Sequence, residues 1–331
     1  MQNSLGFKRF EKQLEKLDAI LSSAKASENS TILFYKSDAR QVLFYLEALS
    51  RLYKNIHNKN LFDGLKDEFK CLEDQLGKID YYENYQKELA SIPNFPTKLL
   101  EHLQKHHQIA LEKLGNLLKD DDWFKTKLKD ISSELSKADW LKPKEERKEI
   151  AKEIFKEIKD IEKDYETGKL NFNYLEEGVH EFRRQIRWIS IYAQALDGVI
   201  QLKPDDLAEK LRIYLTKEVV GSKFIVMPTA DGSPETIQLS QSAFYALSWM
   251  IARIGDLKDE GLKLICVEEC MREINYLPEE EIQDAAKKLI PNLKITPKQI
   301  KIEMKTLVDK FINDDKVLAI LRNDLKSIYK D

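Results

Sequence analysis

The chain has 331 residues, of which 54 are basic and 57 acidic, so its formal net charge at pH 7 is −3. With a charge this close to zero, any site for a polyanion must be a local patch of basic side chains. The 11 glycines and 9 prolines argue against an all-β fold rich in turns. The 3 cysteines are too few for a disulfide framework, so the cytoplasm is the expected compartment.

The two ends and the hydropathy of the chain give no sign of targeting or of a membrane span. The N-terminal segment is amphipathic and charged, and it lacks the continuous apolar stretch of a secretory signal. The chain contains no uncharged apolar run of about 18 residues, the length that a spanning helix needs. We therefore expect a cytoplasmic protein that does not enter a membrane.

Apolar residues recur at intervals of three and four along most of the chain, which predicts an all-α fold. In residues 8–25, for example, Phe10, Leu14, Leu17 and Leu21 are separated by Lys and Glu. The predicted helices, in chain order, cover residues 8–25, 36–56, 61–90, 97–119, 121–137, 143–166 and 178–200, a segment starting at Pro204, and residues 240–276, 279–290 and 297–329.

Two stretches depart from the helical pattern. Residues 91–96 contain two prolines, and they predict a break between helices. In residues 223–239, the apolar run at 224–226 favours a strand, and the sequence Asp-Gly-Ser-Pro at 231–234 is a turn signal. This second stretch therefore predicts a short β-hairpin inserted among the helices.

Three short motifs occur in the same order in both halves of the chain. The separation in sequence between the two copies of a motif increases from the first motif to the third. This predicts insertions in the second half, and the first insertion contains the predicted hairpin. We therefore predict an internal duplication, with residues 1–170 and 171–331 as two helical-bundle halves of one compact domain. The matched residues are Arg40 with Arg183, Gly77 with Gly255, and Asp121-Asp122 with Asp314-Asp315.

The most informative segment is the predicted helix that begins near residue 178. Its apolar residues form one seam with alternating spacings of three and four, which predicts a buried face; they are Val179, Phe182, Ile186, Ile189, Ala193 and Leu196. A second face carries His180, Arg183, Arg184 and Arg187. Guanidinium groups bind phosphate through two oxygens at once, and a protonated histidine also donates to it. The same residues are equally consistent with a solvated helix face whose arginines pair with neighbouring carboxylates.

The sequence VHEFRRQIRWI at 179–189 resembles the signature helix of the CHAD family, the conserved histidine α-helical domain. His180, Arg183 and Arg187 match the histidine and arginines of that helix. A second element of the family, Leu-Gly-x-x-Arg-Asp, is similar to residues 254–259, where Lys258 replaces the arginine. The resemblance extends from about residue 8 to residue 329. It implies two four-helix bundles related by a pseudo-twofold axis, with a basic groove that binds inorganic polyphosphate or a similar polyanion without catalysis.

The chain departs from the family pattern mainly in its first half. Acidic, aromatic or small side chains stand there where the family carries histidine or arginine: Ser37, Phe44, Tyr45, Glu47 and Asp80. In the second half, Trp188 and Ser190 replace further basic residues. Because each phosphate contact contributes to the affinity for a polyanion, these changes weaken the expected binding.

From these observations we predict a non-catalytic protein that binds inorganic polyphosphate or another phosphate-rich anion in a basic groove between the two halves. The predicted binding residues are His180, Arg183, Arg184, Arg187, Lys258, Arg40, Lys36, Lys298, Lys301 and Lys305. No cofactor or metal is expected. The alternative is a helical interaction scaffold that has lost anion binding, with a protein partner or a second copy of the chain as its ligand. An enzyme acting on phosphate compounds is a third reading, for which the sequence offers no convincing nucleophile or base.

Two other pairs of residues are candidates for chemical sites. His102 and His106 are four residues apart on a predicted helix, but the sequence supplies no third ligand beside them. They are expected to serve at most as weak contacts for an anion. Cys266 and Cys270 follow an apolar stretch and are expected to be buried. The aromatic residues are expected to pack in the bundles, and the negative net charge argues against nucleic acid as a partner.

Overall fold

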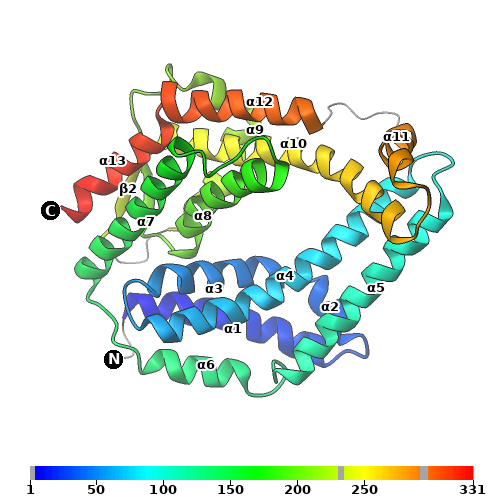
Figure 1. Cartoon of the computed structure of the whole chain (residues 1–331). Coiled ribbons are helices and arrows are strands. Elements are labelled where there is room, and N and C mark those ends of the chain that lie inside the picture. The colour runs from blue at the N-terminus through cyan, green and yellow to red at the C-terminus, as the bar shows by residue number, and fades with distance from the viewer. Residues whose placement is uncertain (1–3, 230–234, 291–296, 331) are drawn as a thin grey trace.

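The computed structural model describes residues 4–229, 235–290 and 297–330, with the side chains at 176, 258–260 and 297 excepted. Most of these residues are helical, as predicted, and the strands of the described part form one small two-stranded sheet. The helices lie around a ring, with the N-terminal helices along one side and the C-terminal helices along the other (Figure 1). None of the described helices has both the length and the apolar character that crossing a membrane requires.

The N-terminal side of the ring is built around the long helices α4 and α5. Helix α3 packs against α4, α4 packs against α5, and α1 lies along α3. The predicted break at 91–96 is confirmed: α4 and α5 are separate helices, and Asn94 between them has a left-handed backbone with φ of 60°. The helices of this side are α1 (Leu5–Lys25), α2 (Ser30–Tyr35), α3 (Ala39–Tyr53), α4 (Lys59–Ala90), α5 (Thr97–Asp120) and α6 (Lys127–Ser136).

The C-terminal side is built around α10, the longest helix of the described chain. Helices α8, α12 and α13 pack against it, and α7 lies mainly along α13. The elements of this side are α7 (Pro143–Glu166), the π-helical turn η1 (Leu175–His180), α8 (Glu181–Ala195), the 3-10 turns η2 (Arg212–Tyr214) and η3 (Lys223–Ile225), α9 (Lys217–Val220), α10 (Gln241–Glu273), α11 (Glu279–Leu289), α12 (Pro297–Asp309), the π-helical turn η4 (Lys310–Asp314) and α13 (Val317–Tyr329).

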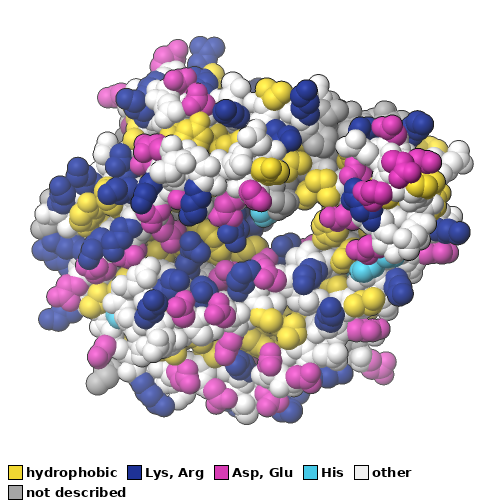
Figure 2. All heavy atoms as spheres, viewed as in Figure 1, with side chains coloured by type: hydrophobic (Ala, Val, Ile, Leu, Met, Phe, Trp, Pro, Cys, Tyr) yellow, Lys and Arg dark blue, Asp and Glu magenta, His cyan; other side chains and the backbone are white. Residues whose placement is uncertain are grey.

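Within the described residues, the two sides of the ring meet in two regions. In the first, α3 packs against α8 and α7, and Arg9 of α1 pairs with Glu146 of α7. In the second, the tip of the α4–α5 pair packs against the end of α10 and against α11 through a hydrophobic cluster that includes Leu89, Leu99, Leu103, Leu264 and Met271. We call this cluster the second core. Figure 2 shows an opening between the two sides of the molecule.

The predicted β-hairpin within 223–239 is wrong. Strand β2 (Ile237–Ser240) pairs in parallel with β1 (Ile200–Lys203), whereas a hairpin requires antiparallel neighbours. The segment Lys223–Ile225 is a 3-10 turn, capped by the Ser222 hydroxyl, which accepts from Phe224 N at 3.2 Å. The apolar side chains of β2 are buried against the rest of the fold, and the long connection from β1 permits parallel pairing. The predicted turn at 231–234 lies outside the described residues.

Two predicted helices also differ from the structure. No helix starts at Pro204, because the Asp205 carboxylate accepts from Leu207 N and from Ser242 N, at 2.9 Å in both cases, which fixes a turn there. The helix predicted over 297–329 is divided into α12, η4 and α13, and Lys316 has a left-handed backbone with φ of 56°. The first difference arises from hydrogen bonds of a side chain to the backbone, and the second from a turn of the chain. The spacing of apolar residues predicts neither of them.

Candidate functional site

The buried seam predicted on the helix near residue 178 is confirmed. The helix begins as the π-helical turn η1 and continues as α8. All the seam side chains are buried: Val179, Phe182, Ile186, Ile189, Ala193 and Leu196. This burial fixes the rotation of α8, so that Arg183 and Arg187, four residues apart, lie together on a neighbouring face.

The side chain of Arg187 crosses from α8 to α3. Its guanidinium carbon lies 4.3 Å from the centroid of the Phe44 ring, and the guanidinium of Arg40 lies 5.6 Å from the same ring. One aromatic side chain therefore contacts arginines from both sides of the molecule, through the attraction between a cation and the face of a π-system. We call Arg40, Arg183 and Arg187 the arginine cluster.

Arg187 is the least compensated member of the arginine cluster. Among the residues that the structure describes, no carboxylate forms an ion pair with it. Burial lowers the pKa of Arg187 to about 10, with Arg183 and Arg40 adding to the effect and Glu73 and Glu47 opposing it. Burial and the two neighbouring guanidinium groups therefore both disfavour the charged form of Arg187.

Arg40 is held by acidic side chains of α4. Its Nε donates to Glu73 Oε1 at 2.8 Å, and its Nη1 donates to Asp80 Oδ2. Burial disfavours the charged form of Arg40, but these two carboxylates outweigh it, and the pKa of Arg40 is raised. The carboxylates of Glu73 and Asp80 thus compensate the positive charge of Arg40.

Two buried carboxylates lie beside the arginine cluster. Glu47 and Glu73 have 5% and 6% of their surface exposed. Burial and the neighbouring Glu73 raise the pKa of Glu47 to about 7, and burial also raises the pKa of Glu73, against the influence of Arg40. The charge of this region therefore changes near neutral pH, since Glu47 gains a proton as the pH falls.

Each of two arginines of the cluster lies against a glycine of a long helix. A Cβ added to Gly77 of α4 would lie 2.8 Å from Arg40 Nη2, and one added to Gly255 of α10 would lie 3.0 Å from Arg183 Nη2. The Nε of Arg183 also donates to the carbonyl oxygen of Ile251 at 3.1 Å. Both glycines permit a close approach of the guanidinium to the helix.

The other predicted binding residues lie on several elements of the fold. Arg184 is 58% exposed and pairs with Glu181 at 2.6 Å. His180 is partly buried at the end of η1, and Lys36 is exposed at the end of α2. Lys298, Lys301 and Lys305 lie on α12, which packs against α10 and η1. Lys258 lies on α10, but its side chain is outside the described part.

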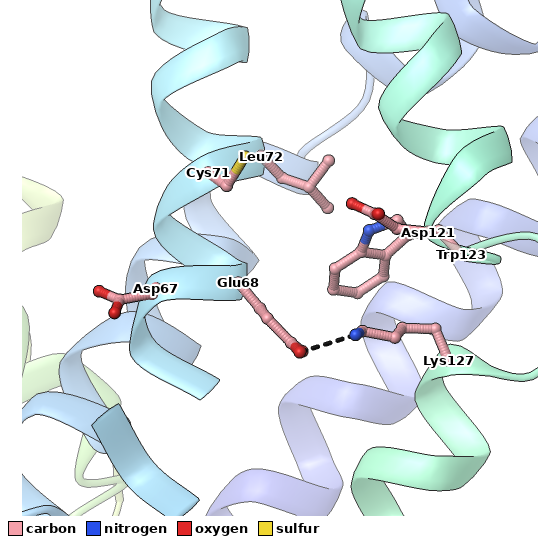
Figure 3. A pocket seen from close by; sticks show the side chains of 7 residues that line it. All are labelled: Asp67, Glu68, Cys71, Leu72, Asp121, Trp123 and Lys127. Carbon is pink, nitrogen blue, oxygen red and sulfur yellow. Dashed lines mark hydrogen bonds and ion pairs between the residues drawn. The ribbon is translucent and has the colours of Figure 1, made fainter. Parts of the chain in front are cut away.

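A separate pocket opens where α4, α5 and α6 meet, with a volume of about 280 Å³. Figure 3 shows Glu68 of α4 pointing to Lys127 of α6, and Leu72 of α4 pointing toward Asp121 and Trp123, while Asp67 points away from them. The ammonium of Lys127 pairs with Glu68 at 2.7 Å, while burial and the charge of Asp121 raise the pKa of the Cys71 thiol. An excess of carboxylates repels phosphate, and a raised thiol pKa disfavours a nucleophilic cysteine.

Sequence reasoning missed two contributors to the arginine cluster. Phe44 was interpreted only as a lost arginine, although its ring contacts two arginines. Glu73 was not singled out at all. Its spacing was a usable signal, because Glu73, Gly77 and Asp80 are at positions i, i+4 and i+7 of one helix and therefore share the face that receives Arg40.

No family model, curated protein or solved structure matches the chain. The resemblance to the CHAD family therefore depends on the quoted motifs alone and stays a prediction. The chemistry of the candidate site has to be argued from its own geometry: three guanidinium groups from two helices, one of them without an ion pair among the described residues, around an aromatic ring.

Proposed function

We propose that the chain binds a phosphate-rich anion at the arginine cluster, with inorganic polyphosphate as the ligand that the family resemblance implies. The observation that carries the proposal is the state of Arg187. Its partly buried guanidinium lies near Arg183 and Arg40, forms no ion pair with a described carboxylate, and has a lowered pKa. A phosphate oxygen placed between these groups would supply the missing negative charge and accept two hydrogen bonds from one guanidinium.

We infer that residues 1–170 and 171–331 are related halves, although α7, at the end of the first half, packs mainly along α13 of the second. The support is the repeated contact of an arginine with a glycine, Arg40 with Gly77 and Arg183 with Gly255. The helices that carry them also pair alike, α3 with α4 and α8 with α10. The two halves of the proposed site are unequal, because Arg40 is already engaged by carboxylates. Arg183 and Arg187 therefore supply most of the binding free energy.

The proposal is tested by titrating the protein with long-chain polyphosphate at about 50 and about 200 mM salt. Two arginine contacts, those of Arg183 and Arg187, each contribute about −0.7 to −0.9 to the salt slope and give a roughly 7- to 12-fold loss of affinity over this range. In Arg187→Ala the affinity for polyphosphate falls, and the magnitude of the salt slope decreases by about 0.7 to 0.9. Arg187→Lys, which keeps the charge but loses the planar fork, has an intermediate affinity.

Two further arginines serve as comparisons in the same titration. Arg212 is 79% exposed and pairs with Glu209, so Arg212→Ala keeps the wild-type affinity and slope. Arg184→Ala has a small effect, because Arg184 is paired with Glu181. Absence of binding at low salt, or equal losses in Arg187→Ala and Arg212→Ala, would refute the proposal.

The pH dependence of binding gives an independent test. Glu47 lies beside the cluster with a pKa of about 7, and its ionised form repels an anion. Affinity for polyphosphate therefore rises as the pH falls from about 8 to about 6. In Glu47→Gln the affinity at pH 8 is higher than in the wild type and the pH dependence is smaller.

An assembly surface between copies of the chain is the second candidate function. It is favoured by four large apolar side chains, Ile213, Val220, Phe224 and Val226, which are each at least 52% exposed within the connection from β1 to β2. Burial of such side chains drives association. Sedimentation equilibrium measures the oligomeric state, and a dimer that dissociates in Val226→Asp supports this candidate, whereas a monomeric wild type excludes it.

A further inference from the structure

Two histidines of α5 and one glutamate of α10 converge at the edge of the second core. His102 and His106 are four residues apart, so their rings lie on one face of α5, with centroids separated by 4.4 Å. Glu273, the last residue of α10, contacts both imidazole groups. It belongs to the C-terminal side of the molecule, whereas the two histidines belong to the N-terminal side. We propose that His102, His106 and Glu273 form a binding site for a divalent transition-metal ion such as zinc.

The distances among the three side chains suit a metal ion. Glu273 Oε2 lies 2.7 Å from His102 Nε2 and 3.2 Å from His106 Nε2. One ligand atom from each residue lies within 4.8 Å of the others. Zinc binds imidazole nitrogen and carboxylate oxygen at about 2.0–2.2 Å, which places tetrahedral ligand atoms about 3.3 Å apart. Both distances from Glu273 to the histidines lie on the short side of this separation.

The ligand types favour a transition metal over magnesium or calcium. Imidazole nitrogen favours zinc, copper or nickel, whereas magnesium and calcium take oxygen ligands. Two histidines and one glutamate are a known ligand set for zinc with a fourth position open to water. Solvent can reach that position, because His106 and Glu273 are 29% and 54% exposed. The nearby Cys270 is buried in the second core and does not complete the set.

A bound ion would connect the two sides of the ring at their second contact. His102 and His106 belong to the N-terminal side and Glu273 to the C-terminal side, 171 residues after His102. An ion held by all three favours the closed ring, because it binds the folded state and not the unfolded one. Zinc should therefore raise the Tm of the protein, whereas magnesium should not.

The site is tested on the full-length chain after dialysis against a chelator. Calorimetric titration with zinc chloride should give one bound ion per chain, and magnesium chloride should give none. Cobalt(II) should show the visible absorption of a four-coordinate site. His106→Gln and Glu273→Gln should each weaken zinc binding by at least about tenfold and abolish the rise in Tm.

Neighbouring residues provide matched controls for these variants. His107 follows His106 in α5, but its ring faces Tyr35, at a centroid distance of 6.5 Å. Glu101 is exposed on the same helix. His107→Gln and Glu101→Gln should therefore keep one zinc ion per chain with the wild-type affinity.

Two outcomes would overturn the proposal. One is the absence of zinc binding to the wild type. The other is zinc binding that Glu273→Gln leaves unchanged, since this would place the ion elsewhere. Because Glu273 is half exposed and ends its helix, its substitution by glutamine should not unfold the chain. Far-ultraviolet circular dichroism of each variant verifies this before titration.

Discussion

A buried ion pair joins α1 to α7 and offers the sharpest test of what stabilises the fold. Arg9 Nη1 lies 2.9 Å from Glu146 Oε2, and the two side chains are only 6% and 2% exposed. The Tyr53 hydroxyl donates to Glu146 Oε1 at 2.7 Å, and Arg9 Nε donates to the carbonyl oxygen of Leu196 at 3.1 Å. The network thus connects α1, α3, α7 and the end of α8.

We expect Arg9→Met to destabilise the protein strongly, because Glu146 would stay buried without its cation. Removal of one partner from a buried ion pair costs about 3–5 kcal/mol. For a chain of 331 residues, an unfolding entropy of about 2.1 cal/mol/K per residue converts this loss into a fall in Tm of about 4–7 °C. Differential scanning calorimetry measures the change directly.

An exposed ion pair on the same helix is the matched control. Lys12 pairs with Asp197 at 2.7 Å, and the two side chains are 46% and 27% exposed. Exposed pairs contribute about 0.2–1 kcal/mol, so Lys12→Met should lower Tm by less than about 1.5 °C. The double variant Arg9→Met/Glu146→Leu should recover most of the loss, because no charge stays unpaired. Equal effects of Arg9→Met and Lys12→Met would refute this reasoning.

Three other features give measurable differences in stability or reactivity. The pKa of Glu47 is about 7 in the folded state, against 4.5 for the free group. The free energy of unfolding should therefore fall by up to about 3 kcal/mol as the pH rises from about 4.5 to 7. In urea titrations, Glu47→Gln should lack this pH-dependent fall. Gly178→Ala should cost about 1–3 kcal/mol, because its Cβ would clash with the backbone carbonyl of Asn171. Gly255→Ala meets only a flexible side chain and should leave Tm nearly unchanged. Of the three thiols, the exposed Cys71 should react with a thiol reagent in the native protein, and all three should react after unfolding.

The helices could be predicted from the sequence because their signal is local. The apolar seam of α8 and the break between α4 and α5 need only the spacing of nearby residues, and both were predicted. The pairing of β1 with β2 could not be predicted in this way. It joins Ile200 to Ile237 across a connection whose course depends on tertiary contacts, and a strand signal does not identify its partner.

The candidate site could be predicted only in part, for the same reason. The sequence placed Arg183 and Arg187 on one face of a helix, and the structure agrees. It could not show that Phe44 lies beneath two arginines, since that contact requires α3 and α8 to meet. The third ligand for His102 and His106 was likewise hidden, because Glu273 approaches only when the ring closes.

Both candidate sites lie where the two sides of the ring meet, and neither can form within one side alone. The arginine cluster needs Arg40 and Phe44 from α3 together with Arg187 from α8. The metal site needs the histidines of α5 together with Glu273 of α10. Ring closure brings charged and metal-binding groups together from distant parts of the chain, and its two contacts hold them in place. A ligand at either contact would therefore favour the closed ring, because binding free energy adds to the stability of the state that forms the site.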